Sequence, residues 1–98
     1  MTGSSESDVD VRNALVGRQF VLVYQPIYDL DTLSLVGFEA LLRWNHPTRG
    51  QLAPADFLAA LEASGQIVDV GRWVLLEACR QMASWRAAGS SLTVSVNI

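Results

Sequence analysis

An apolar run at residues 38–44 carries one acid and one base, Glu39 and Arg43, and otherwise has the composition of a β-strand. Because side chains alternate between the two faces of an extended chain, both charges fall on the same face of this predicted strand. Burying an unpaired carboxylate costs more free energy than one strand can supply, so Glu39 needs a cation, a metal ion or a hydrogen-bonding partner. Two interpretations are open: a structural ion pair between Glu39 and Arg43, and a functional acid.

Composition limits the class of protein. The 98 residues, half of them hydrophobic, suffice for one small domain with a modest core. A net charge of -3 argues against binding to a nucleic-acid polymer but allows a local pocket for a phosphorylated small molecule. The single cysteine, Cys79, provides no disulfide framework, and we expect it to be semi-buried and inert. Because the sequence shows neither a membrane-spanning run nor a signal peptide, we expect a cytoplasmic protein without membrane insertion.

Local patterns divide the chain into nine segments. In chain order these are a flexible tail (1–8), a short helix (about 8–17), a strand (20–27), a turn (29–32), a strand (from 33), a loop (45–50), a helix (54–64), a longer helix (67–85) and a final strand (92–98). No turn residues follow the last segment, so we expect the chain to be the front portion of a larger domain.

The two first strands are expected to form a hairpin. They are joined by a short turn, and a parallel return would need a crossover of a dozen or more residues, so the pairing is antiparallel. The first strand is apolar without interruption and is therefore predicted to be buried on both faces, with Pro26 confining it to an end or an edge. In such a hairpin Gln25 lies about one diagonal step from Glu39.

The final strand is expected to run parallel to the second strand, because two helices separate them. Ligands of α/β sheets bind at the carboxyl ends of parallel strands, which is where Arg43 and Asn97 are found. Thr93, Ser95 and Asn97 face one way from the final strand. A polar series of this kind favours the interior of a barrel whose mouth holds a ligand.

Six short blocks, in order, resemble the opening of an EAL domain from about Val11 to Ile98. They are Tyr24-Gln25-Pro26-Ile27, Glu39-Ala40-Leu41-Leu42-Arg43-Trp44-Asn45-His46-Pro47, Gly65-Gln66-Ile67, Gly71-Arg72-Trp73-Val74-Leu75, Ala78-Cys79-Arg80-Gln81 and Val94-Ser95-Val96-Asn97. A lone Glu-Ala-Leu triplet is not specific, whereas six blocks at family spacing are. The resemblance implies a metal-dependent phosphodiesterase, a hydrolase that cleaves the bacterial second messenger cyclic di-GMP to pGpG.

The resemblance also implies a fold and a set of site residues. The fold is α/β, the first part of a TIM-like (β/α)8 barrel with an antiparallel first strand, formed by residues 9–98. Glu39 and Asn97 resemble ligands of Mg²⁺ or Mn²⁺, with Glu39 counted as catalytic, because hard cations prefer oxygen donors. Gln25, Glu39 and Arg43 resemble substrate-binding residues, and a guanidinium suits a phosphate.

The resemblance covers only the front of the family's domain, so we expect these 98 residues alone to be inactive. The family's remaining metal-ligating acids and its catalytic lysine have no counterpart in the printed sequence. Cyclic di-GMP is the implied partner, and a homodimer or linkage to sensory or GGDEF domains fits the family. The alternative is a degenerate or truncated EAL module that binds a nucleotide or a protein without catalysis.

For six further residues we prefer a structural interpretation to a functional one. We expect a loop role for His46, turn formation by Asp29 and Asp31, a helix-end or loop-anchoring role for Glu62, and packing for Trp73 and Trp85. The functional alternatives are a zinc ligand for the histidine, a cation site for the acids and a base-stacking platform for the tryptophans.

Overall fold

The computed structural model describes residues 11–97, in which the chain divides into two compact units. Of the described residues, the first unit contains residues 11–21 and Leu42–Arg72, and the second contains Leu22–Leu41 and residues 73–97. Residues 11–16 are helical, which agrees with the second half of the predicted first helix. The predicted flexible tail and the start of that helix lie outside the described residues.

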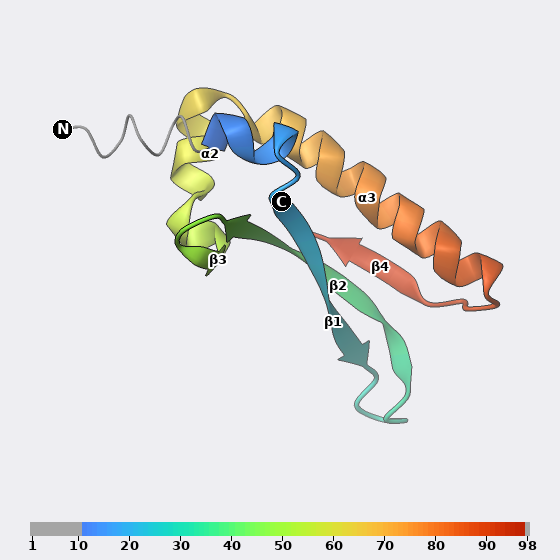
Figure 1. Cartoon of the computed structure of the whole chain (residues 1–98). Helices are drawn as coiled ribbons and strands as arrows, with labels where there is room; N and C mark the ends of the chain where they lie inside the picture. The colour runs from blue at the N-terminus through green and yellow to red at the C-terminus, as the bar shows by residue number, and fades with distance from the viewer. Residues whose placement is uncertain (1–10, 98) are drawn as a thin grey trace. The chain divides into compact units, whose positions relative to one another are not determined.

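After the helical residues 11–16, three strands are followed by a 3-10 helix, two α-helices and a fourth strand (Figure 1). The elements are β1 (Phe20–Tyr28), β2 (Leu35–His46), β3 (Gly50–Leu52), a 3-10 helix (Pro54–Asp56), α2 (Leu58–Ser64), α3 (Ile67–Ala87) and β4 (Thr93–Val96). Over the described part of the chain, no helix combines the length and the apolar character that crossing a membrane requires.

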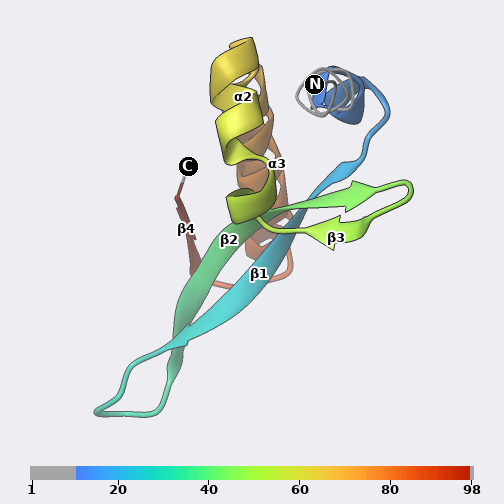
Figure 2. The same ribbon diagram turned by 90° about the vertical axis from the view of Figure 1, so that its left-hand side faces the viewer.

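Strands β1 and β2 form the predicted hairpin (Figure 2). At its tip the Asp29 amide donates to the Ser34 carbonyl oxygen at 2.8 Å. The Asp29 carboxylate accepts hydrogen bonds from the amides of Asp31, at 2.8 Å, and Thr32, at 3.2 Å. This side chain replaces backbone partners that the tight turn cannot supply, so the turn-forming role expected of Asp29 is confirmed.

Strand β4 pairs with β2 in parallel, as the crossover predicted. The register places Gly37 opposite Thr93 and Glu39 opposite Ser95. Gly37 allows this close approach, because a Cβ at that position would lie 2.6 Å from the Thr93 carbonyl oxygen. The α/β class expected from the sequence is therefore confirmed.

The loop predicted at residues 45–50 is a tight hairpin instead. Asn45 and His46 continue β2 and pair antiparallel with β3, with Asn45 opposite Gln51 and His46 opposite Gly50. The physical reason lies in the His46 ring, whose Nδ1 accepts the amides of both Thr48 and Arg49 at 3.1 Å. With those two amides satisfied, strand pairing can continue up to the turn.

The single helix predicted at residues 54–64 is interrupted at Phe57. This residue adopts φ -142° and separates the 3-10 helix from α2. Its ring is buried against Phe20 and Trp44, with ring centroids 5.8 Å apart in each pair. Burial of an aromatic ring is worth more than one continuous turn of helix, so tertiary packing overrides the local pattern. Gly65 ends α2 in the left-handed conformation, as expected.

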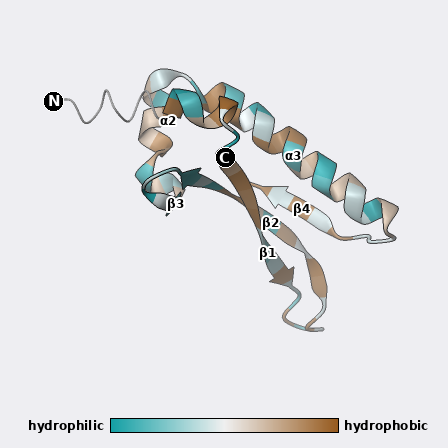
Figure 3. Ribbon diagram, viewed as in Figure 1, coloured by the Kyte–Doolittle hydropathy of each residue, from teal (hydrophilic) through white to brown (hydrophobic). Residues whose placement is uncertain are grey.

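The second unit is built on the predicted apolar stripe of α3. Val74 and Ala78 are buried, and Trp85 packs against Tyr24 of β1 and Phe38 of β2 with ring centroids 5.2 and 4.8 Å apart. The packing role expected of Trp85 is confirmed. Figure 3 shows hydrophobic and hydrophilic residues alternating along α3, which is the pattern of a helix with one covered side.

Two burial predictions were wrong. Strand β1 is not buried on both faces, because Val23 and Ile27 expose 41% and 38% of their surface. Their neighbour Tyr24 points to the α3 side, and successive side chains of a strand point to opposite faces. Cys79 is exposed and not semi-buried, because it lies off the stripe formed by Val74 and Ala78.

Candidate functional site

The two faces of the sheet in the second unit differ in what covers them. Tyr24 and Phe38 both contact Trp85, so they mark the face that α3 covers. Gln25 and Glu39 directly follow these residues in their strands and therefore point to the opposite face. The structure thus brings two of the predicted site residues to one side of neighbouring strands.

Strand β4 adds the third predicted residue of this unit. Ser95 lies opposite Glu39, and paired residues of parallel strands point to the same face. Asn97 follows the last residue of β4, Val96, is exposed, and belongs with Thr93 and Ser95 in the strand's alternation. We call the side of the sheet away from α3 the open face. The residues that define it are Gln25, Glu39, Thr93, Ser95 and Asn97.

Glu39 is half-buried. Within the second unit, the described residues offer its carboxylate no hydrogen bond and no ion pair. The ion pair described in this unit joins Glu77 to Arg80 on α3, at 2.6 Å. The Glu39 carboxylate is therefore left without a protein partner in the described part of its own unit.

Arg43 belongs to the first unit, because the division between the units falls within β2 after Leu41. Its side chain is half-buried, and Nη1 donates to the Leu42 carbonyl oxygen at 2.8 Å. One hydrogen bond leaves most of the guanidinium's five N–H groups for other acceptors.

The oxygen atoms on the open face are of the chemical type that a hard cation prefers as ligands. Glu39 offers a carboxylate and Asn97 an amide oxygen, both of which Mg²⁺ and Mn²⁺ accept. Between residues 11 and 97, however, no three His, Cys, Asp or Glu side chains come close enough together to hold a metal ion. The described residues therefore supply only part of the ligand set of a metal ion. That part consists of two oxygen donors, from Glu39 and Asn97.

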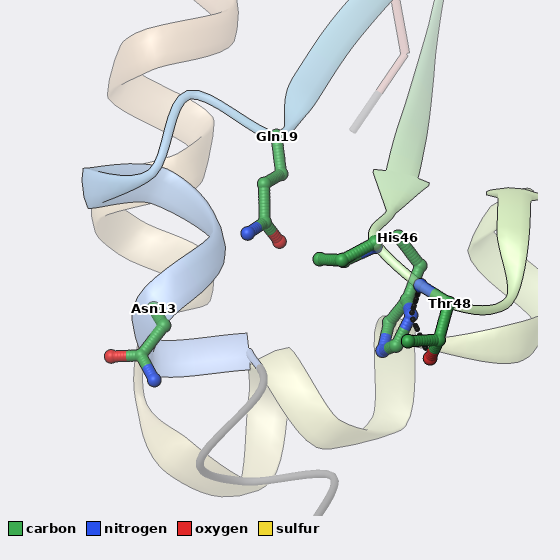
Figure 4. A pocket seen from close by; sticks show the side chains of 5 residues that line it. Asn13, Gln19, His46 and Thr48 are labelled. Atoms are coloured by element: carbon green, nitrogen blue, oxygen red, sulfur yellow. Dashed lines mark hydrogen bonds between the residues drawn. The ribbon is translucent and has the colours of Figure 1, made fainter.

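A separate cavity of about 280 Å³ lies in the first unit, lined by Asn13, Gln19, His46, Pro47 and Thr48 (Figure 4). None of the predicted site residues lines it. The Gln19 amide oxygen accepts a hydrogen bond from Trp44 Nε1 at 2.9 Å, and His46 Nδ1 serves the turn. The structural role expected of His46 is confirmed, but the residue plays it from the last position of β2 and not from a loop.

A second cluster of ionisable groups lies on the α3 side, away from the open face. Burial raises the pKa of the Tyr24 phenol, the negative charge of Glu77 raises it further, and the positive charge of Arg80 opposes both. The hydrogen bond from Arg80 lowers the pKa of the Glu77 carboxyl.

Glu62 is exposed in the last turn of α2, in keeping with a helix-end position.

Comparison with known families decides the membership of the chain. The EAL domain family matches residues 8–98. The chain belongs to the EAL domain family. The open face of this EAL chain carries the glutamate of the name-giving triplet, Glu39-Ala40-Leu41, on β2.

Two curated relatives of this EAL chain are cyclic di-GMP enzymes by name. The chain is 47% identical over 90 residues to the bifunctional diguanylate cyclase/cyclic di-GMP phosphodiesterase MucR of Pseudomonas aeruginosa, covering 91% of this chain and 13% of MucR. It is 46% identical over 93 residues to the cyclic di-GMP phosphodiesterase PdeR of Escherichia coli, covering 93% of this chain and 14% of PdeR. The chain thus spans only about an eighth of these relatives.

Solved structures show the same likeness in three dimensions. The PaMucR phosphodiesterase in its c-di-GMP complex matches with a TM-score of 0.90 and 45% identity, over 95% of this chain and 38% of that one. The Xanthomonas citri FimX EAL domain in complex with c-di-GMP matches with a TM-score of 0.81 and 30% identity, over 97% and 36%. The EAL chain therefore has the fold of the corresponding part of these domains.

Sequence reasoning placed Ser95 on the polar side of the last strand but did not place it beside Glu39. That neighbour relation depends on the register between β2 and β4. Alternation within each strand predicts the face of a residue, and only the pairing fixes which residue lies next to it.

Proposed function

We propose that this chain forms the first part of an EAL-type phosphodiesterase domain that hydrolyses cyclic di-GMP to pGpG. The observation that supports the proposal is the gathering of Gln25, Glu39 and the polar series of β4 on the open face of a chain 47% identical to MucR. In the proposed domain the sheet continues into a TIM-like barrel with an antiparallel first strand. The open face then becomes the barrel interior, and the carboxyl ends of β2 and β4 lie at the ligand site.

Each predicted site residue has a task in this proposal. Glu39 and Asn97 supply oxygen ligands to Mg²⁺ or Mn²⁺, which when bound activates water and neutralises charge on a phosphodiester. Pairing of β2 with β4 fixes the backbone that carries Glu39. Gln25 donates and accepts hydrogen bonds with the substrate, and the planar fork of Arg43 binds a phosphate.

The proposed setting is the bacterial cytoplasm, where cyclic di-GMP is a signal. The name of MucR combines a diguanylate cyclase with a phosphodiesterase. On that pattern, sensory or GGDEF domains and a homodimer are the partners that we propose for a full protein.

We expect the 98-residue chain alone to lack phosphodiesterase activity. Two oxygen donors are too few for Mg²⁺, which requires near-octahedral coordination and gives up its water reluctantly. The test is to incubate the purified chain with cyclic di-GMP and Mn²⁺ or Mg²⁺ and to separate the products by chromatography. Formation of pGpG by a preparation free of full-length enzyme would contradict the expectation.

A chimera tests whether this segment carries the proposed site. Residues 9–98 would replace the matching segment of P. aeruginosa MucR, whose remaining domain supplies the rest of the barrel. We expect the chimera to hydrolyse cyclic di-GMP and Glu39→Ala to abolish turnover, because the proposed metal ligand is lost.

The matched control is Glu62→Ala, which removes an exposed acid of α2 in the first unit and changes none of the residues that define the open face. It should leave turnover unchanged. A folded chimera that retains turnover with Glu39→Ala at ordinary metal concentrations would refute the role given to Glu39.

The alternative function is a module that binds a nucleotide or a protein without catalysis. The same chimera separates the two functions. A folded chimera that binds cyclic di-GMP but forms no pGpG supports the binding module.

A further inference from the structure

The neighbour of Glu39 on the open face is a hydroxyl group. The β2–β4 register places Ser95 directly opposite Glu39, one strand spacing of about 4.8 Å away, and both side chains point to the same face. A serine hydroxyl donates one hydrogen bond, and an ionised carboxylate can only accept. Strand pairing therefore sets a donor beside an acceptor at the centre of the proposed site.

The Glu39 carboxylate needs such a donor. It is half-buried, and within the second unit the structure shows no hydrogen bond or ion pair to it. Thr93, the other hydroxyl residue on the open face of β4, pairs with Gly37 and lies two residues away along the strand. Gln25 comes from β1, on the opposite side of β2. Ser95 is thus the hydroxyl residue that the register pairs with Glu39.

We propose that Ser95 is a positioning residue for Glu39. The two side chains are not hydrogen-bonded in the structure, but they are register partners, and rotation about their side-chain torsions lets the hydroxyl donate to one carboxylate oxygen across the β2–β4 pair and leaves the other oxygen for the ligand. The functional meaning of this contact rests on the proposed function, in which Glu39 binds a metal ion, whereas the contact itself does not. Holding a flexible side chain in its binding geometry lowers the entropy lost when the ligand arrives.

A double-mutant cycle on the 98-residue chain tests the contact without metal or substrate. The substitutions are Ser95→Ala, which removes the donor, and Glu39→Met, which keeps side-chain length and removes the acceptor. We expect Ser95→Ala to lower the folding equilibrium constant about threefold when Glu39 is present, in line with cross-strand pairs, and to have no such effect beside Met. Equal effects of Ser95→Ala in both backgrounds would overturn the proposal.

Two matched variants separate the hydrogen bond from ordinary strand effects. Ser95→Thr keeps a hydroxyl and should restore the coupling to Glu39. Thr93→Val removes a hydroxyl on the same face, opposite Gly37, and should show no coupling. Coupling of equal size at Thr93 and Ser95 would contradict a specific role for Ser95.

A spectroscopic readout covers the case in which Glu39→Met does not fold. The ¹³C chemical shift of the Glu39 carboxylate reports on its hydrogen bonds at fixed pH. We expect the shift to change in Ser95→Ala and to stay near the wild-type value in Ser95→Thr. An unchanged shift in Ser95→Ala would overturn the proposal, whereas an inactive MucR chimera would count against the proposed function alone.

Discussion

The aromatic clusters of the two units differ in how completely each is covered. In the first unit each of Phe20, Trp44 and Phe57 exposes 3% of its surface or less. The Trp44 indole N–H donates a hydrogen bond to the Gln19 amide oxygen. In the second unit the rings around Trp85 remain half-buried, and the buried Tyr24 hydroxyl has no hydrogen-bond partner among the described residues.

The difference indicates a division of tasks. A cluster closed on all sides stabilises the fold, but its surface cannot meet a ligand. In the second unit α3 covers one face of the sheet, and the other face stays accessible to carry Gln25, Glu39 and Ser95. On the proposed function, stability and binding therefore fall to different residues of the same short chain.

The largest expected effect compares one phenylalanine from each cluster. Phe57→Ala empties a fully buried site and should cost about 3–5 kcal/mol of unfolding free energy. Phe38→Ala removes a half-buried ring and should cost about 1–2 kcal/mol. Denaturant unfolding of both variants measures the difference. Equal losses would show that the two clusters are equally important for stability.

The next effect compares two glycines. Gly37→Ala places a Cβ 2.6 Å from the Thr93 carbonyl oxygen, so β4 must shift, at a cost of about 1–3 kcal/mol. Gly50→Ala meets no atom within 4 Å but strains a backbone with φ +78°, at a cost of about 1 kcal/mol. Hydrogen exchange should show loss of protection in β4 for Gly37→Ala and only around the β2–β3 turn for Gly50→Ala. Loss of β4 protection in both variants would contradict this assignment.

The smallest effect concerns the unpartnered phenol of Tyr24. Tyr24→Phe should change stability at neutral pH by less than about 0.5 kcal/mol, because no hydrogen bond is lost. Burial raises the pKa of Tyr24 in the folded state, so the folded chain retains this proton better than the unfolded chain does. The resulting stability is complete below the unfolded pKa of about 10 and is lost as pH rises through the folded pKa.

Unfolding measured from pH 8 to 11 checks the sign. The wild-type chain should lose stability above about pH 10 more steeply than Tyr24→Phe. Tyr28→Phe is the control, because Tyr28 is 55% exposed at the end of β1. This variant should lose stability at high pH as steeply as the wild type. Identical pH profiles for the wild type and Tyr24→Phe would show that Tyr24 does not contribute to the loss.

The sequence predicted the features that depend on local chemistry and connection length. The Asp29 turn, the parallel return of β4 and the buried stripe of α3 follow from turn residues, crossover length and helical period. The break at Phe57 did not follow, because its cause is contact with Phe20 and Trp44, which are distant in the sequence.

For the candidate site, alternation predicted the shared face of Glu39 and the polar residues of the last strand. It did not predict that Ser95 would be the neighbour of Glu39, because register depends on pairing between residues 56 positions apart in the sequence. The exposed side of β1 also escaped prediction, since an unbroken apolar run is equally compatible with one covered face or two. The roles of Gln25, Arg43 and Asn97 stay predictions.

The β2–β3 turn has a consequence for the chemical state of His46. Because Nδ1 faces two backbone N–H groups, it must present a lone pair, and in the neutral ring the proton then resides on Nε2. This fixes one tautomer, which ¹⁵N spectroscopy can identify. While the β2–β3 turn is intact, Nδ1 is therefore occupied by the backbone and does not serve as a metal ligand.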